Sequence, residues 1–147
     1  MKSFLEAKSI IEANGGDFDG PKPVALVDAA RKALGVEFPP SYRAFLLELG
    51  CGDINGFEVY GVTDGNFHDS SIPNGIWLTL TEREEGLSKQ YILIGDRGDG
   101  SRYAIDAGSV DKDGESPVVV LSVDGESLET VSQSFGDFFL DSVRKVV

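Results

Sequence analysis

The sequence predicts an α+β domain in which a twisted, mainly antiparallel β-sheet is packed against N-terminal helices and one C-terminal helix. Apolar residues in positions 1–50 recur with helical spacing, positions 56–123 contain short alternating or β-branched runs, and helical spacing returns near position 132. Helices and strands that are grouped along the chain, without regular alternation, are typical of this fold class. We expect residues 1–147 to form a single domain, because that length suits one hydrophobic core.

Three helices are expected in the first third of the chain. The first spans residues 3–14, where Ser3 and Glu6 have the spacing of a capping box. The second, 23–34, begins at a proline and ends before a glycine. The third, near 40–49, follows two prolines that can open a helix but cannot lie within one, and its apolar residues recur at i, i+3, i+4 and i+7.

After residue 52 the apolar residues no longer recur with helical spacing, which predicts strands. Residues 56–61 alternate between apolar and polar side chains and are bounded by glycines, which indicates a short strand. Residues 62–75 are rich in Gly, Asn, Asp, Ser and Pro, which predicts a surface loop. The segment "IWLTLTEREEGLS" (76–88) is compatible with a strand or a helix, and its run of charged residues favours the helix.

The remaining elements are a hairpin, a strand and a helix. Residues 91–94 and 101–106 are apolar-rich runs joined by "DRGDG", and 116–123 is β-branched and long enough for a central strand. Ser132 or Ser134 is expected to open a closing amphipathic helix.

The "DRGDG" segment has four possible roles: a metal loop, an Arg-Gly-Asp signal, a catalytic carboxylate pair, or the turn of a hairpin. An EF-hand loop needs further acidic ligands and a distal glutamate that neither this segment nor residues 111–115 supply. His68 stands beside serines in "FHDSS", but neighbouring loop residues seldom form a catalytic triad. Asp and Gly favour turns, so we expect a hairpin, with no catalytic residue and no metal site.

The charge is strongly negative and unevenly distributed. The chain has 25 acidic and 13 basic residues, a net charge of −12, and residues 51–147 hold −11 of it. This balance argues against nucleic-acid and anionic-membrane partners and favours a basic protein partner. The alternative is that the negative surface only keeps the protein soluble.

The numbers of cysteine and histidine residues and the hydropathy of the sequence exclude further kinds of site and segment. One cysteine, Cys51, and one histidine cannot form an internal disulfide or a structural zinc site. No apolar run approaches the length of a membrane span, and neither end resembles a signal peptide. We therefore expect a cytoplasmic protein that needs no cofactor.

Three blocks of the sequence resemble the SMI1/KNR4 (SUKH) superfamily. They are "FPPSYRAFLLELGCGDINGFEVYG" (38–61), "ILIGDRGDGSRYAID" (92–106), and "SPVVVLSVDGES" followed by "VSQSFGDFFLDSV" (116–143). The resemblance implies a non-enzymatic α+β interaction domain. Bacterial members of this superfamily are commonly immunity proteins that neutralise a cognate toxin, often a nuclease or deaminase, and fungal relatives are regulatory scaffolds.

The expected function is therefore that of an immunity protein, not an enzyme, which binds a basic toxin; a scaffold that recruits host proteins is the alternative. We expect the docking surface on an uncovered face of the sheet and its loops. The candidate aromatic anchors are Tyr60, Phe67 and Trp77, although Trp77 also suits the core. The candidate charged contacts are Asp64, Asp69, Asp96, Asp99, Asp111, Asp113 and Glu115.

Overall fold

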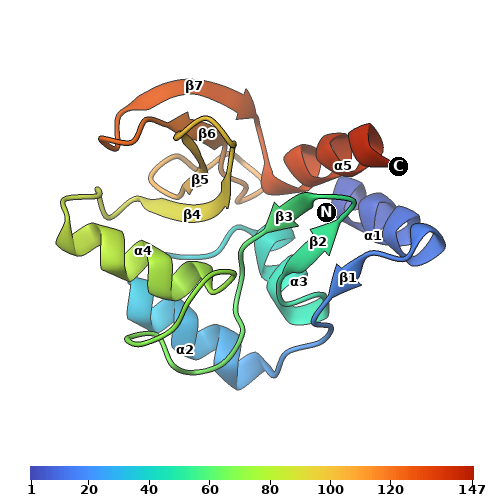
Figure 1. Ribbon diagram of the computed structural model, residues 1–147, viewed down its shortest axis with the longest axis horizontal. Helices are drawn as coiled ribbons and strands as arrows, with labels where there is room; N and C mark the ends of the chain where they lie inside the picture. Colours follow the sequence, from blue (N-terminus) through green and yellow to red (C-terminus); the bar gives the residue numbers. More distant parts are fainter.

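The computed structural model describes all residues, 1–147, and confirms the α+β class (Figure 1). The strands form two antiparallel sheets, in the orders β1-β2-β3 and β4-β5-β6-β7, whereas the sequence predicts one. In chain order the elements are α1 (Lys2–Asn14), β1 (Asp17–Phe18), α2 (Val24–Leu34), α3 (Pro40–Glu48), β2 (Gly52–Ile54), β3 (Phe57–Val59), α4 (Gly75–Glu84), β4 (Tyr91–Asp96), β5 (Arg102–Asp106), β6 (Val118–Leu121), β7 (Ser127–Ser132) and α5 (Phe135–Val146).

The first three helices lie where they were predicted. Helix α2 starts directly after Pro23 and ends at Gly35, which has a left-handed φ of 70°. The predicted capping box is wrong, because α1 already begins at Lys2 and the Ser3 hydroxyl donates a hydrogen bond to Asp137 of α5 instead. Ser3 therefore joins the two ends of the chain, where α1 and α5 lie side by side in Figure 1.

The helical assignment of α4 is confirmed, and a residue outside the predicted segment caps it. The buried Asn74 side chain accepts hydrogen bonds from the backbone N–H groups of Ile76 and Trp77. Helix α5 is capped as expected by Ser134, which accepts from the Asp137 N–H. No helix of the structure is both long enough and apolar enough to cross a membrane.

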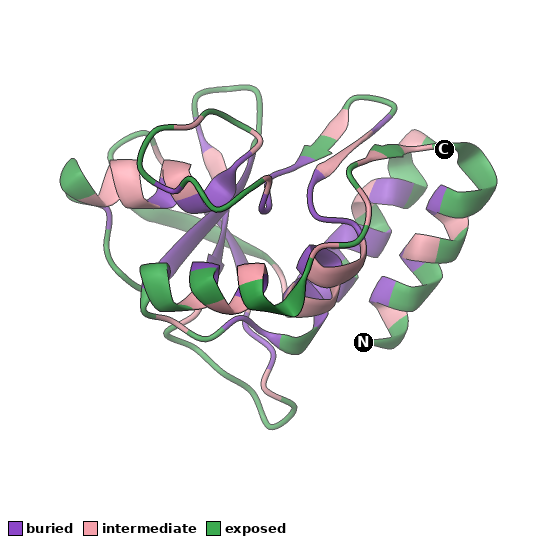
Figure 2. Ribbon diagram, turned by 90° about the horizontal axis from the view of Figure 1, so that it is seen from below, coloured by how far each residue is buried: buried purple, intermediate pink, exposed green.

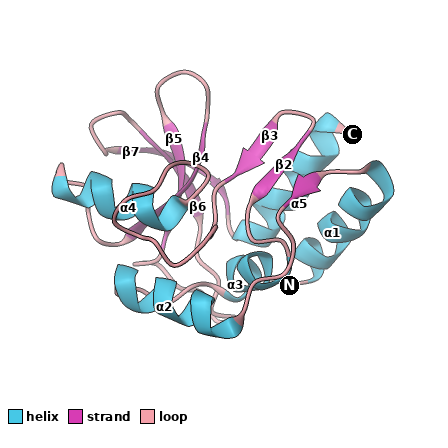
Figure 3. Cartoon of the chain, turned by 60° about the horizontal axis from the view of Figure 1, so that its bottom comes forward, coloured by secondary structure: helices cyan, strands magenta, loops and turns pink.

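The main core joins the helices to both sheets (Figure 2). Its centre is a cluster of aromatic rings from α1, β1, α3, β3 and α5, in which Phe139 stacks on Phe135 at a centroid distance of 5.4 Å and meets Phe45 edge-on at 5.3 Å. Figure 3 shows the helices around the strands, with α2 and α3 below them and α1 to the right, beside the three-stranded sheet.

Both faces of the four-stranded sheet are covered along β4, β5 and β6, which contradicts the expectation of an exposed face, whereas β7 stays mostly exposed. The cross-strand row Ile92–Ile105–Val118 faces the main core. The next row, Leu93–Ala104–Val119, faces a second cluster that includes Leu87 and is packed against by Leu78 of α4. Burial on two faces explains why β4 and β6 are continuous apolar runs instead of alternating ones.

Candidate docking surface

Two turns lie side by side at one end of the four-stranded sheet. The β4–β5 turn and the β6–β7 turn meet there because Arg102, the first residue of β5, pairs with Leu121, the last residue of β6. Between the turns is a shallow hollow of about 260 Å³ whose lining includes Asp99, Val123 and Leu128. Both turns project from the sheet and are available to a partner.

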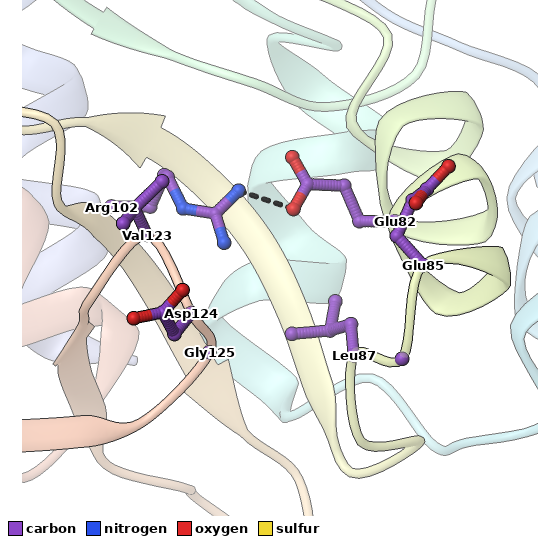
Figure 4. A pocket seen from close by; sticks show the side chains of 8 residues that line it. Glu82, Glu85, Leu87, Arg102, Val123, Asp124 and Gly125 are labelled. Carbon is purple, nitrogen blue, oxygen red and sulfur yellow. Dashed lines mark ion pairs between the residues drawn. The ribbon is translucent and has the colours of Figure 1, made fainter.

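A second hollow, of about 190 Å³, lies on the other side of the β6–β7 turn (Figure 4). Its walls are the end of α4, with Glu82 and Glu85, and the turn itself, with Asp124. Arg102 points toward Glu82, and the two form an ion pair at 2.5 Å. Val123 lines both hollows and is 75% exposed, so the hairpin tip presents an apolar side chain between acidic walls.

A third group of acids adjoins these hollows near the end of β4. Burial raises the pKa of the Tyr60 hydroxyl, and the carboxylates of Glu58 and Asp96 raise it further. Both carboxylates therefore lie close enough to act on that hydroxyl electrostatically.

We call this region the acidic end. Its cations, Arg97 and Arg102, are already paired with Glu129, at 3.0 Å, and with Glu82. Eight carboxylates against two guanidinium groups leave an excess of six negative charges. The carboxylates of the acidic end belong to Glu58, Glu82, Glu85, Asp96, Asp99, Asp124, Glu126 and Glu129.

Within the acidic end, Asp96 and Asp99 also build the "DRGDG" turn. Asp96 accepts a hydrogen bond from the Gly98 N–H at 2.6 Å. Asp99 accepts bonds from the hydroxyl and the N–H of Ser101, and these bonds lower the pKa of Asp99. The turn is thus a hairpin, and its Asp99 carboxylate is held ionised at the surface.

A family model described as SMI1-KNR4 cell-wall matches residues 3–144, nearly the whole chain. The chain belongs to the SMI1-KNR4 (SUKH) family. This match confirms the resemblance of the three sequence blocks and extends it over the segment between them. No curated protein matches the sequence.

The structure places the predicted contact residues of this SUKH chain in several separate regions. Asp96 and Asp99 belong to the acidic end, whereas Asp64 and Asp69 are exposed in the loop after β3. Tyr60 and Phe67 were predicted as anchors, but they are only 5% and 8% exposed, because their rings are packed in the interior. Trp77 is half-buried on α4.

The other predicted acids lie in the β5–β6 loop, at the opposite end of β5. Asp111 and Asp113 are exposed there. Glu115 is 8% exposed, and its carboxylate accepts hydrogen bonds from the Ser41 N–H at 3.0 Å and the Ser41 hydroxyl at 2.7 Å. Its prediction as a contact residue is wrong, since Glu115 holds the start of α3, and Ser41 in turn accepts from the Gly136 N–H of α5.

Replacing Glu115 by alanine should therefore destabilise the SUKH fold. Ser41 would lose the charged acceptor of two hydrogen bonds, and bonds to charged groups contribute about 1.5–3 kcal/mol. We expect the free energy of unfolding in urea to fall by about 2 kcal/mol. Asp113→Ala is the control, because that side chain is exposed, and it should change stability by less than about 0.5 kcal/mol. Equal stability of both variants would contradict the assigned role.

A row of like charges crosses the three-stranded sheet, and the sequence pattern gives no sign of it. Asp17 lies opposite Asp53, and Asp53 lies opposite Glu58, so the three carboxylates share one face. None of them takes part in an ion pair. Burial raises the pKa of Glu58, and the charge of Asp53 raises it further.

Glu58→Gln should stabilise this SUKH chain at neutral pH. The pKa of Glu58 is higher in the folded chain than in the unfolded chain. Stability therefore falls as the pH rises from the unfolded pKa to the folded pKa, because Glu58 ionises more readily in the unfolded chain. We expect the variant to be more stable than wild type by roughly 0.3 kcal/mol at neutral pH, with the gain lost at low pH, where Glu58 is protonated in both states. Urea unfolding at both pH values tests this, with Asp113→Asn as the control; a gain that persists in acid would refute it.

Proposed function

We propose that this SUKH chain is an immunity protein that binds a cationic toxin domain through the acidic end and thereby neutralises it. The observation that supports the proposal best is the excess of six negative charges around two projecting turns. Membership of the SUKH family is consistent with such a role. The neutralising step is binding, and it uses no catalytic residue, cofactor or metal.

Electrostatics gives this proposal a mechanism. A toxin domain that acts on nucleic acid needs a basic surface to hold phosphates. An inhibitor of opposite charge is steered toward that surface and raises its association rate, and the bound inhibitor then occupies the site that the nucleic acid would use. Charge alone gives limited affinity, so apolar contacts are also required. The exposed Val123 and Leu128 lie between the acids and supply them.

Co-expression with the toxin domain encoded by the adjacent gene tests the proposal. The wild-type chain should restore growth, and the double variant Asp124→Lys/Glu126→Lys should fail to restore it or should bind the purified domain at least about tenfold more slowly. The matched control Asp69→Lys/Asp113→Lys makes the same change of charge at exposed sites outside the acidic end. Failure of the wild-type chain to protect would refute the immunity function, and equal protection by both variants would refute the role of the acidic end.

A further inference from the structure

The two edges of the four-stranded sheet differ in how they are protected. The β4 edge is covered, because the Leu93 N–H donates to the Thr79 hydroxyl of α4 at 3.0 Å and the Ile94 carbonyl accepts from the Tyr60 N–H at 2.8 Å. The β7 edge has no such cover. Its only backbone hydrogen bonds are those of the ladder with β6, and its outer N–H and C=O groups face solvent.

Strand β7 also lacks most of the features that prevent edge strands from pairing. It has six residues, five of them exposed, and contains neither lysine nor proline. The features of this kind that β7 does have are two irregularities in its register with β6 and one charged residue, Glu129. Leu128 and Val131 are 58% and 40% exposed, so the open edge also displays apolar side chains.

A groove beside β7 offers room for the side chains of an added strand. This hollow of about 460 Å³ lies between β7 and α5, and its apolar lining is formed by Tyr103, Val131 and Phe138. The rings of Tyr103 and Phe138 are 4.9 Å apart, which provides an aromatic surface for contact. Its polar lining carries two acids, Glu129 and Asp141, and two bases, Lys145 and the Arg97 that is paired with Glu129.

The charge of the β6–β7 hairpin favours one kind of partner for the open β7 edge. The β6–β7 hairpin, residues 118–132, contains no lysine or arginine and three acidic residues, Asp124, Glu126 and Glu129. A second copy of the chain paired edge to edge would bring two such acidic hairpins together, which like-charge repulsion disfavours. An extended segment rich in lysine or arginine would instead be attracted.

We propose that β7 binds an extended, cationic segment of the partner as a fifth strand of this sheet, with alternate side chains directed into the groove beside α5. Main-chain hydrogen bonds to the β7 edge would provide affinity, and the acids near the hairpin would favour lysine and arginine side chains. The inference rests on the proposed function, because the partner is the same toxin domain.

Amide hydrogen exchange of the wild-type chain tests the pairing directly. The probe is the toxin domain encoded by the adjacent gene, inactivated by a substitution in its catalytic site. On binding, alternate amides within residues 127–132 should exchange at least about tenfold more slowly, because they become hydrogen-bonded, and α2 should be unchanged.

A pair of double variants completes the experiment. Leu128→Lys/Val131→Lys should weaken binding at least about tenfold, since lysine at an edge opposes both pairing and a cationic partner. The control Leu5→Lys/Val110→Lys changes two apolar residues elsewhere that are at least half exposed, and it should weaken binding less than about threefold. A complex that leaves β7 exchange unchanged would overturn strand addition but not the immunity function, whereas no complex with the wild-type chain would overturn both.

Discussion

Replacing Phe139 by alanine is expected to lower the free energy of unfolding by about 3–5 kcal/mol, because the change removes a large aromatic side chain from the centre of the core. Phe139 is fully buried in α5 and lies where α1, β1, α3 and β3 converge. The alanine variant loses these contacts and leaves a cavity that rigid helices cannot close. The rings within 6.3 Å of Phe139 are those of Phe4, Phe18, Phe45, Phe57 and Phe135.

Urea unfolding followed by circular dichroism measures this loss. Leu5→Ala is the control, because Leu5 is a large apolar residue on the neighbouring α1 that is 51% exposed, and its loss should cost less than about 0.5 kcal/mol. If Phe139→Ala lowered the free energy of unfolding by less than about 1 kcal/mol, the aromatic cluster would not be the main contact between the helices and the three-stranded sheet.

Gly61→Ala should have the second largest effect, a loss of about 3 kcal/mol or more. A methyl group on Gly61 would overlap the carbonyl oxygen of Gly50, which accepts a hydrogen bond from the Val62 N–H at 3.0 Å. The obstacle is backbone, so no side chain can rotate to relieve it. Gly61 also donates to the Pro73 carbonyl and accepts from the Gly75 N–H, which fixes its position.

The same loop provides the control for Gly61. Gly65 has a single neighbouring atom, 3.9 Å from the position of an added methyl group, and its φ is not positive. Gly65→Ala should therefore unfold at nearly the wild-type urea concentration. If the two variants had equal stability, the close approach of Gly61 to Gly50 could not be a constraint on this fold.

The helices could be predicted because local chemistry determines where they begin and end. Pro23, Pro40 and Ser134 mark three helix starts, and helical spacing of apolar residues predicts the side that is buried. The β4–β5 hairpin could be predicted for the same reason, since its turn residues are adjacent in sequence. The three blocks of family resemblance include α3, the β4–β5 hairpin and α5 among these locally determined elements.

The sheet arrangement could not be predicted, because long-range contacts determine it. Strands β1, β2 and β7 are short or mostly polar and give no clear alternation, so pairing with a distant neighbour decides their conformation. The only sequence feature that indicated burial of both faces of the four-stranded sheet, along β4 to β6, was the pair of continuous apolar runs in β4 and β6.

The candidate surface was predicted in part. Asp96 and Asp99 lie in the acidic end as exposed turn residues, and the Asp and Gly content of "DRGDG" predicts such a turn. The burial of Tyr60 and Phe67 and the contact of Glu115 with Ser41 depend on residues far away in sequence, 74 positions in the last case. The acidic end itself unites segments from residue 58 to residue 129, so no sequence window could show it.

The dependence of the association rate on salt tests the central claim most directly. For the wild-type chain and the toxin domain encoded by the adjacent gene, we expect the association rate constant to fall at least about tenfold between roughly 0.05 M and 0.5 M NaCl, with a smaller change in the dissociation rate. The Asp124→Lys/Glu126→Lys variant should show a shallower dependence. An association rate constant that is the same across this range would contradict recognition of a cationic partner by the acidic end.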